Sequence, residues 1–339
     1  MASPSTCSRP NAGASTRCAS VRRHRRQWNK KDGRLRRKKE VRVRSGFVAI
    51  IGRPNAGKST LLNRVIGEKI AIVSDKPQTT RTRILGVKNY AAGQIVFVDT
   101  PGIHRPLHRM NVRMVDAAVD SLQEVDVAML VHDASTRPGK GDEYVSKLLS
   151  EATVPVILVL NKIDLISKPK LLPLIDQLRQ WHDFADIVPV SAATGDGIDR
   201  LERLLLEKLP EGEPRYPEDF LTDQPQRTLA AETVREKVLQ HTRAELPFST
   251  AVVIDQYEEP QKPGGLTRIY CTILVEQESQ KPIVIGRAGD MIKRIGTEAR
   301  LDLEASLGGK VFLDLRVKVK ADWRDDERVL DDLGLPRRQ

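Results

Sequence analysis

The sequence predicts an α/β fold with a mostly parallel sheet, followed by a smaller α+β domain. Between residues 45 and 209, short apolar runs alternate with amphipathic runs of helical period, which is typical of βαβ units. A Gly-rich loop separates the first apolar run from the first helical run. Residues 210–227 contain four prolines and five acidic residues and break the pattern. We therefore expect an acidic linker or docking strap there, and a second domain over residues 228–335.

The individual elements follow from periodicity and turn residues. In the first domain we expect strands at Phe47–Ile51, Ile95–Asp99, Val127–Val131, Val156–Leu160 and Ile187–Val190, and helices at Lys58–Ile66, Met110–Glu124, Asp142–Leu149, Leu171–Trp181 and Ile198–Leu209. In the second we expect helices at Leu229–Glu245, Asp290–Leu307 and Asp325–Leu333, and extended runs at Ser249–Tyr257, Thr267–Val275, Ile283–Ile285 and Val311–Lys320. Spacing places Val112, Val115, Val119 and Leu122 on one face of their helix.

Composition excludes several classes of protein. The chain has 339 residues, of which 40% are hydrophobic and 30% charged, as in ordinary globular proteins. Its longest apolar run, Val154–Leu160, is seven residues, whereas a membrane-spanning helix needs roughly 18. The three cysteines form no CxxC pair, which excludes a disulfide framework and a cysteine zinc site. We expect a reducing compartment.

The net charge of +11 is unevenly distributed. Residues 1–44 hold 15 of the 56 basic residues and two acidic ones, so the remaining chain is slightly acidic. This segment is expected to be a disordered basic arm. Its first 26 residues are rich in Ser and Arg and lack acids, so a transit peptide to an organelle, an RNA-binding arm and an inert tail all remain open.

The Gly-rich loop matches the phosphate-binding pattern G-x-x-x-x-G-K-S. Its glycines let successive backbone N–H groups point at phosphate oxygens, and the next helix directs its positive end at the anion. Lys58 is expected to reach the β- and γ-phosphates, and the Ser59 hydroxyl suits Mg²⁺. The nucleotide-binding residues expected here are Gly52, Arg53, Pro54, Asn55, Ala56, Gly57, Lys58, Ser59 and Thr60.

Three further motifs follow at strand ends, where an open α/β sheet binds ligands. Asp99-Thr100-Pro101-Gly102 offers a carboxylate for Mg²⁺ and the Gly102 N–H for the γ-phosphate. Asn161-Lys162-Ile163-Asp164 offers the Asp164 carboxylate to the two N–H donors of guanine. Ser191-Ala192-Ala193 offers a backbone N–H to guanine O6. The four motifs in this order predict GTP and GDP as ligands, with Mg²⁺.

These motifs resemble those of the translation-factor-related GTPases. The resemblance implies that residues 78–82 form switch I, in which Thr79 or Thr80 closes on Mg²⁺; a polar loop is the alternative. The implied catalytic residues are Lys58, Thr80 and Gly102, and the implied metal ligands are Ser59, Thr80 and Asp99. Ile103 stands where Ras-like enzymes place a water-orienting Gln, so we expect slow intrinsic hydrolysis.

Two smaller features of this region have alternative interpretations. Asn55 is typical of relatives that bind K⁺ beside the phosphates, or it makes a hydrogen bond within the loop. His104 and His108 are four residues apart, with Pro106 between them. Because no third ligand is in view, we interpret them as exposed residues and not as a metal pair.

A GxxG loop lies in the second domain and precedes a predicted amphipathic helix. Missing side chains at Gly286 and Gly289 would let a nucleic-acid backbone approach the helix N-terminus, as in the KH clamp for single-stranded RNA. A simple glycine turn is the alternative. Ile292, Ile295, Ala299 and Leu303 have the spacing to pack that helix on a sheet. The RNA-binding residues expected here are Ile285, Gly286, Arg287, Ala288, Gly289, Lys293 and Arg294.

The whole arrangement is similar to the Era family of ribosome-assembly GTPases, in which a GTPase domain precedes a type II KH domain. The similarity covers about residues 46–335 and is carried by Gly52–Thr60, Gln78–Arg81, Asp99–Gly102, Pro217–Asp223, Ile285–Arg300 and Val311–Trp323. It implies binding to the single-stranded 3′ region of 16S rRNA, a role in 30S subunit assembly gated by the nucleotide, and a cytoplasmic monomer with loose inner-membrane association.

Two other classes compete with this interpretation. A nucleotide-regulated membrane GTPase would need an amphipathic or apolar paddle, which the sequence lacks. A constitutive RNA-binding protein with a vestigial GTPase domain would not need Lys58, Ser59, Asp99 and Asp164, which are all present.

Overall fold

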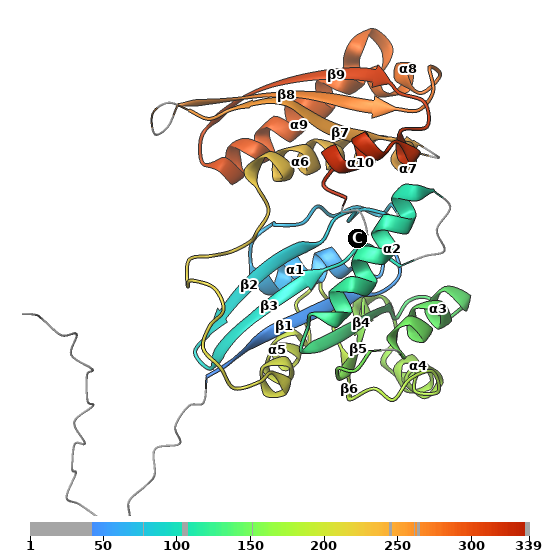
Figure 1. The fold of residues 1–339 in the computed structure, drawn as a ribbon. Coiled ribbons are helices and arrows are strands. Elements are labelled where there is room, and N and C mark those ends of the chain that lie inside the picture. Colours follow the sequence, from blue (N-terminus) through green and yellow to red (C-terminus); the bar gives the residue numbers. More distant parts are fainter. Residues whose placement is uncertain are drawn as a thin grey trace, which may run out of the picture. The chain divides into compact units, whose positions relative to one another are not determined.

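A computed structural model describes residues 43–76, 78–103, 108–150, 152–243, 246–260, 262 and 265–335. Almost all of the predicted basic arm, together with His104 and Pro106, lies outside the described residues. Within them, the chain forms a six-stranded sheet and, after the Pro-rich segment, a three-stranded sheet (Figure 1).

The larger sheet has the strand order β2-β3-β1-β4-β5-β6. Its strands are β1 (Arg44–Ile51), β2 (Ile84–Tyr90), β3 (Gly93–Asp99), β4 (Val127–Asp133), β5 (Val156–Asn161) and β6 (Asp186–Pro189). All neighbouring strands pair in parallel except β2 and β3, which form an antiparallel hairpin. The edge strand β2 was not predicted from the sequence, because its second half is polar and only partly buried and no long apolar run marks it.

Helices cover both faces of this sheet, as expected for parallel strands (Figure 1). They are α1 (Lys58–Ile66), α2 (Arg109–Gln123), α3 (Lys140–Leu149), α4 (Leu171–Leu178) and α5 (Ile198–Lys208), with 3₁₀ turns at Ile163–Leu165 and Lys168–Lys170. Helices α1 and α5 pack in one apolar core and α2, α3 and α4 in the other. Val112 was expected on the buried face of α2, but it is 45% exposed. This part of the helix turns Met110 and Met114 inward, and they pack against the C-terminal part of the chain.

The Pro-rich segment lies along the edge strand β2. The Val87 N–H donates to the Leu221 carbonyl at 2.9 Å, and the Leu85 N–H donates to the Asp223 carboxylate at 3.1 Å. The rings of Tyr216 and Phe220 stack 4.6 Å apart and cover a small apolar cluster on β2 and β3. Of the two expectations, linker or strap, the described geometry is that of a strap that protects an open sheet edge.

The second sheet consists of β7 (Ala251–Glu258), β8 (Leu266–Val275) and β9 (Lys310–Val319), with β7 antiparallel and β9 parallel to the central β8. The other elements here are α6 (Gln226–His241), α7 (Leu246–Ser249), α8 (Lys281–Ile285), α9 (Asp290–Leu307), α10 (Glu327–Asp332) and 3₁₀ turns at Arg287–Gly289 and Trp323–Asp325. Helices α6 and α9 pack on one face of this sheet (Figure 1). On α9, Ile295, Ala299 and Leu303 are buried as expected, whereas Ile292 is only partly buried.

The predicted strand at Ile283–Ile285 is wrong, because these residues belong to helix α8. Pro282 lies in the first turn, and the Gln280 side chain accepts hydrogen bonds from the Glu276 and Gln277 N–H groups just before it. The proline in the first turn favours a helix start, and the Gln280 contacts close the turn before it. Three consecutive β-branched residues are ambiguous in sequence, and of them only Val284 is fully buried.

The strap supplies a test of the fold. Phe220→Ala should lower the free energy of unfolding by about 1–3 kcal/mol, because the ring is partly buried on β2 and a fully buried Phe would cost about 3–5 kcal/mol. Leu172→Ala, at a side chain that is 69% exposed, should change stability by less than about 0.5 kcal/mol. Denaturant unfolding of both variants measures the difference. Equal stabilities would show that the strap does not pack on the sheet.

Candidate nucleotide-binding site

The phosphate-binding loop connects the end of β1 to the start of α1, as the motif requires. Gly57 caps α1 with φ 89°, a backbone conformation that favours glycine. A side chain there would also collide with the Asn161 amide, whose nitrogen lies 2.3 Å from the Cβ position. The Asn161 amide donates to the Ala56 carbonyl at 3.0 Å. The loop is therefore held between its own strand and the end of β5.

Lys58 is buried in this loop. Its ammonium donates to the Gly52 and Arg53 carbonyls, both at 3.1 Å. Burial lowers the pKa of Lys58 to about 8, and the nearby Asp99 carboxylate opposes that shift. Because the cation already lies inside the loop, it needs only to exchange carbonyl oxygens for phosphate oxygens to hold a nucleotide.

Ser59, Thr80 and Asp99 converge beside Lys58. The Ser59 and Thr80 hydroxyl oxygens are 2.7 Å apart, and both lie within hydrogen-bond distance of Asp99 Oδ2, at 2.9 and 3.2 Å. Asp99 Oδ1 is buried and has no partner among the described residues. Burial raises the pKa of Asp99 to about 6. Two hydroxyls and one incompletely paired carboxylate are the hard oxygen donors that Mg²⁺ prefers, so these residues fit the expected ion.

The structure distinguishes the two threonines of the predicted switch I. The Thr79 hydroxyl donates to the Lys76 carbonyl at 2.6 Å, away from Asp99, whereas Thr80 is the threonine beside Ser59. Residues 72–75 and Gln78, Thr79 and Thr80 line a cavity of about 240 Å³ together with the phosphate-binding loop. This segment therefore forms one wall of the site.

The base-recognition motifs lie at the ends of β5 and β6. Asn161 accepts a hydrogen bond from the Ala192 N–H at 3.0 Å, which ties the two motifs together. The ammonium of Lys162 donates to the Asn55 carbonyl and the Asp133 carboxylate. Asp164 and Ala193 are exposed at this edge, whereas Ser191 and Ala192 are buried. The arrangement leaves the two exposed residues facing solvent, where a base could reach them.

Arg64 and Asn63, both on α1, hold two segments of the site in place, although neither residue belongs to a predicted motif. The Arg64 guanidinium donates to the Ala192 and Ala193 carbonyls, which fixes the last motif. The Asn63 side chain accepts from the Ile70 and Ala71 N–H groups and donates to the Ala71 carbonyl, which fixes the chain before residues 72–75. In sequence both residues resemble ordinary polar helix positions, so no local signal identifies them.

The Asp-Thr-Pro-Gly motif closes against the phosphate-binding loop. Thr100 donates to the Ile50 carbonyl, and a Cβ at Gly102 would lie 2.8 Å from the Pro54 nitrogen, so only glycine fits. The Ile103 N–H donates to the Gly52 carbonyl at 3.2 Å, and its side chain is buried in the core. Ile103 therefore cannot orient water, as its chemistry already predicted.

Three other expected residues have structural partners. The Asn55 amide donates to the Asp75 carbonyl at 2.7 Å, which joins the phosphate-binding loop to the segment before switch I and is not a bond within the loop. Arg53 pairs with Asp142 at 2.8 Å. His108 lies 3.3 Å from Asp325. Among the described residues, no group of three His, Cys, Asp or Glu side chains could hold a metal ion.

The GxxG loop joins helix α8 to helix α9, and not a strand to a helix as expected. Gly286 has φ 79°, and a Cβ there would collide with Met291 at 2.6 Å. Gly289 has φ 84°, and a Cβ there would meet nothing within 4 Å, so the space above it is open. The side chains of Arg287, Ala288, Lys293 and Arg294 are exposed around the loop, and Ile285 is half-buried.

Comparisons with known proteins match both the first and the second part of the chain. A family model described as 50S ribosome-binding GTPase matches residues 47–162, and a KH domain model matches residues 245–324. GTPase Era from Geobacter metallireducens is 51% identical over 291 residues, covering 86% of this chain and 97% of that protein. GTPase Era from Geobacter sp. strain M21 is 50% identical, covering 87% of this chain and 99% of that protein.

Two solved structures are also similar. A crystal structure of Era in complex with MgGDPNP and nucleotides 1506–1542 of 16S ribosomal RNA superposes with a TM-score of 0.83 at 44% identity. A single-residue variant of Aquifex aeolicus Era bound to GDP and AlF4⁻ gives 0.82 at 44% identity. Each comparison covers 86% of this chain and 99% of the other.

The fold and the site define a P-loop GTPase joined to a KH domain. Such a protein binds and hydrolyses GTP and binds RNA. About half of the aligned positions are identical to these relatives over most of the chain, which therefore belongs to the Era family of GTPases.

Lys58 supplies the first test of the site. Lys58→Ala should reduce GTP and GDP affinity by at least about 100-fold, because the buried cation is lost beside the phosphates. Lys147→Ala, on the exposed face of α3, is the matched control and should bind as the wild type does. Fluorescent-nucleotide titration measures both. Unchanged affinity in Lys58→Ala would refute the assignment of the loop.

Asp164 tests base recognition. Asp164→Asn should shift the preference from GTP to XTP, because the amide turns one acceptor into a donor that opposes a guanine N–H. Each unpaired donor costs about 1–3 kcal/mol, whereas the 2-carbonyl of xanthine accepts from the amide. Competition of GTP, XTP and ATP against a labelled nucleotide measures the shift. A variant that keeps its guanine preference would show that Asp164 does not contact the base.

Proposed function

We propose that this protein is a GTP-controlled switch that binds the single-stranded 3′ region of 16S rRNA through its KH domain and acts in 16S rRNA processing and 30S subunit assembly. The observation that carries the proposal is the joint presence of a complete phosphate and metal site and an open, cation-flanked GxxG loop in one chain. The similar Era structure with MgGDPNP and nucleotides 1506–1542 of 16S rRNA supports the choice of RNA.

In this proposal each motif has one role at the nucleotide. Residues 52–60 hold the phosphates, and Lys58 balances the charge that develops on them during hydrolysis. Ser59, Thr80 and Asp99 hold Mg²⁺, which shields the phosphate oxygens. The Gly102 N–H contacts the γ-phosphate. At the base end, Asp164 accepts from guanine, and Ala193 contacts O6, because the Ser191 and Ala192 N–H groups donate within the protein.

Hydrolysis needs a water molecule that some group must orient. The Ile103 side chain is buried in the core and has no polar atom. We infer that a backbone group or a bound partner orients the water, so that intrinsic turnover is slow and the GTP form persists long enough to bind RNA. We propose K⁺ beside the phosphates, near Asn55, as a second way to raise the rate.

The alternative of a vestigial GTPase domain fits the described residues less well. A vestigial GTPase domain has no need to bury the two charged groups of Lys58 and Asp99, whose burial costs desolvation energy. Among the described parts of the chain, no helix is both long and apolar enough to cross a bilayer.

The cellular setting is a further part of the proposal. By its similarity to the Era proteins, we infer a cytoplasmic monomer. We also expect peripheral association at the inner membrane. If residues 1–44 act as a transit peptide, we expect the protein in an organelle instead.

The GxxG loop tests the proposal. Ala288→Asp should weaken binding to a 3′-terminal 16S rRNA oligonucleotide by at least about tenfold, because it adds a negative charge beside the phosphates. Asp suits this position, since Ala288 has φ 53°, a left-handed conformation that Asp tolerates. The measurement is fluorescence anisotropy with the full chain in the presence of a GTP analogue.

The matched control is Ser306→Asp, which adds the same charge at the exposed far end of α9. We expect RNA affinity close to that of the wild type. Equal RNA affinity in Ala288→Asp and Ser306→Asp would contradict an RNA-binding role for the GxxG loop.

A further inference from the structure

Two adjacent residues of the KH-domain helix α6, Arg235 and Glu236, contact the backbone of the predicted switch I and of the segment before it. Both residues are 1% exposed. The apolar side of α6, which includes Ala230, Val234 and Val238, packs on the KH sheet. Arg235 and Glu236 therefore emerge from a helix whose position the KH core fixes.

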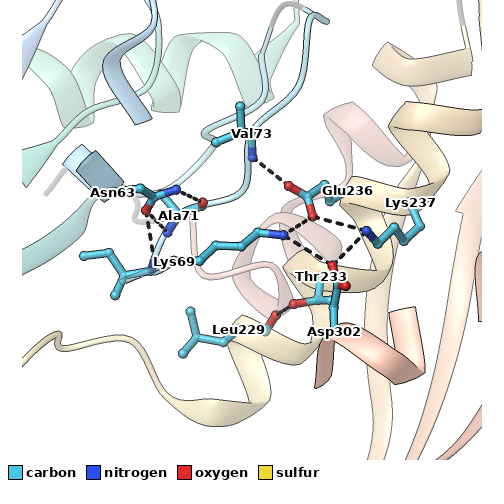
Figure 2. Close-up of polar contacts among 10 residues, drawn as sticks. Asn63, Lys69, Ala71, Val73, Leu229, Thr233, Glu236, Lys237 and Asp302 are labelled. Atoms are coloured by element: carbon cyan, nitrogen blue, oxygen red, sulfur yellow. Dashed lines mark hydrogen bonds and ion pairs between the residues drawn. The ribbon is translucent and has the colours of Figure 1, made fainter. Parts of the chain in front are cut away.

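Glu236 contacts Val73, in the segment before switch I (Figure 2). Its Oε1 accepts a hydrogen bond from the Val73 N–H at 2.9 Å, and its Oε2 accepts one from Lys69 Nζ at 2.6 Å. Lys69 and Lys237 also pair with Asp302 of α9, at 3.4 and 2.7 Å. The four side chains form a charge-balanced group, so Glu236 is buried without an uncompensated charge.

Arg235 contacts Thr79, within the predicted switch I. Its Nη2 donates to the Thr79 carbonyl, and the Glu232 carboxylate holds the same guanidinium at 2.8 and 2.5 Å. Thr79 immediately precedes Thr80, whose hydroxyl lies beside Ser59 and Asp99. Two consecutive residues of one helix thus bind the backbone of this segment: Arg235 donates at Thr79, and Glu236 accepts at Val73.

We propose that Arg235 and Glu236 are positioning residues for the nucleotide site, and that helix α6 clamps switch I in the conformation that places Thr80 at the metal. The inference rests on the proposed assignment of residues 78–82 as switch I. Val73 and Thr79 line the nucleotide cavity, so the clamp holds a wall of that cavity from the KH domain. The KH domain then helps to form the GTP site and also responds to which nucleotide is bound there.

The clamp should favour GTP over GDP, because only the GTP form needs Thr80 at the metal. Coupling of this kind is reciprocal: a closed switch I favours the docked α6, and a docked α6 favours the GTP form. The sensitive quantity is therefore the ratio of the affinities for a GTP analogue and for GDP. A variant with general damage to the fold would lower both affinities and leave their ratio unchanged.

The experiment compares Glu236→Ala with Glu236→Gln in the full chain. Titration with fluorescent GDPNP and GDP at fixed Mg²⁺ gives the affinity ratio. Glu236→Ala should lower the ratio by roughly tenfold, the effect of losing one charge-assisted hydrogen bond. Glu236→Gln retains an oxygen for the Val73 N–H and should stay within about threefold of the wild type. A Gln variant as impaired as the Ala variant would contradict the Val73 contact as the basis of the clamp.

Two further variants separate the clamp from the switch assignment. Lys147→Met removes an exposed cation of α3 that belongs to none of these contacts, and should leave the ratio close to that of the wild type. Thr80→Ala should lower the ratio strongly if switch I is correctly assigned. A lowered ratio in Thr80→Ala with an unchanged ratio in Glu236→Ala would overturn the clamp alone. An unchanged ratio in both would overturn the switch I assignment on which the proposal rests.

Discussion

The structure depends most on the contact of Thr80 with Ser59 and Asp99. Asp99 is completely buried at the end of β3, where burial raises its pKa to about 6 and leaves Oδ1 without a partner among the described residues. Such a carboxylate is costly unless a cation or hydroxyl groups face it. The hydroxyls of Ser59 on α1 and of Thr80 face it here, which ties the loop that carries Thr80 to the sheet.

The residue that follows Thr80 contacts the KH domain directly. Arg81 follows Thr80, and its guanidinium donates to the Thr250 carbonyl at 2.9 Å and lies 5.5 Å from the centre of the Trp323 ring. Burial, with Arg235 nearby, lowers the pKa of Arg81 to about 9. Its Nε and Nη2 have no partner among the described residues, a cost of about 1–3 kcal/mol for each buried donor. An interface with such groups is easier to separate than a purely apolar one, which suits a switch.

The sequence predicts which residues meet at the candidate nucleotide site because each motif is local. A glycine-rich loop, a strand-end Asp and an Asn-Lys-x-Asp run carry their chemistry within a few residues, and βαβ topology brings strand ends together. Thr80 was named as the metal ligand only by resemblance, because two adjacent hydroxyls differ only in where the backbone points them and the residues themselves leave Thr79 equally possible. The strand β2 was missed because its second half is polar and no long apolar run marks it. The helix α8 was predicted as a strand because a short β-branched run does not distinguish strand from helix.

Contacts between the two domains lie beyond sequence reasoning. Arg235, Glu236 and Lys237 resemble a solvated helix face, yet all three are buried, and the first two contact the GTPase domain. Trp323 donates to the Ser249 carbonyl at 2.9 Å and belongs to the same apolar cluster as Met110 and Met114, more than 200 residues away in sequence. Burial of such residues is decided by which surface meets them, and periodicity within one helix carries no information about that surface.

The most direct test of the account is the affinity of the full chain for a 3′-terminal 16S rRNA oligonucleotide, measured with saturating GDPNP and with saturating GDP. If Thr80 couples the nucleotide to the KH domain, RNA should bind at least about fivefold more tightly in the GDPNP form, which is the lower end of ordinary allosteric coupling. The difference should disappear in Thr80→Ala. Equal RNA affinity with the two nucleotides in the wild-type chain would contradict the account.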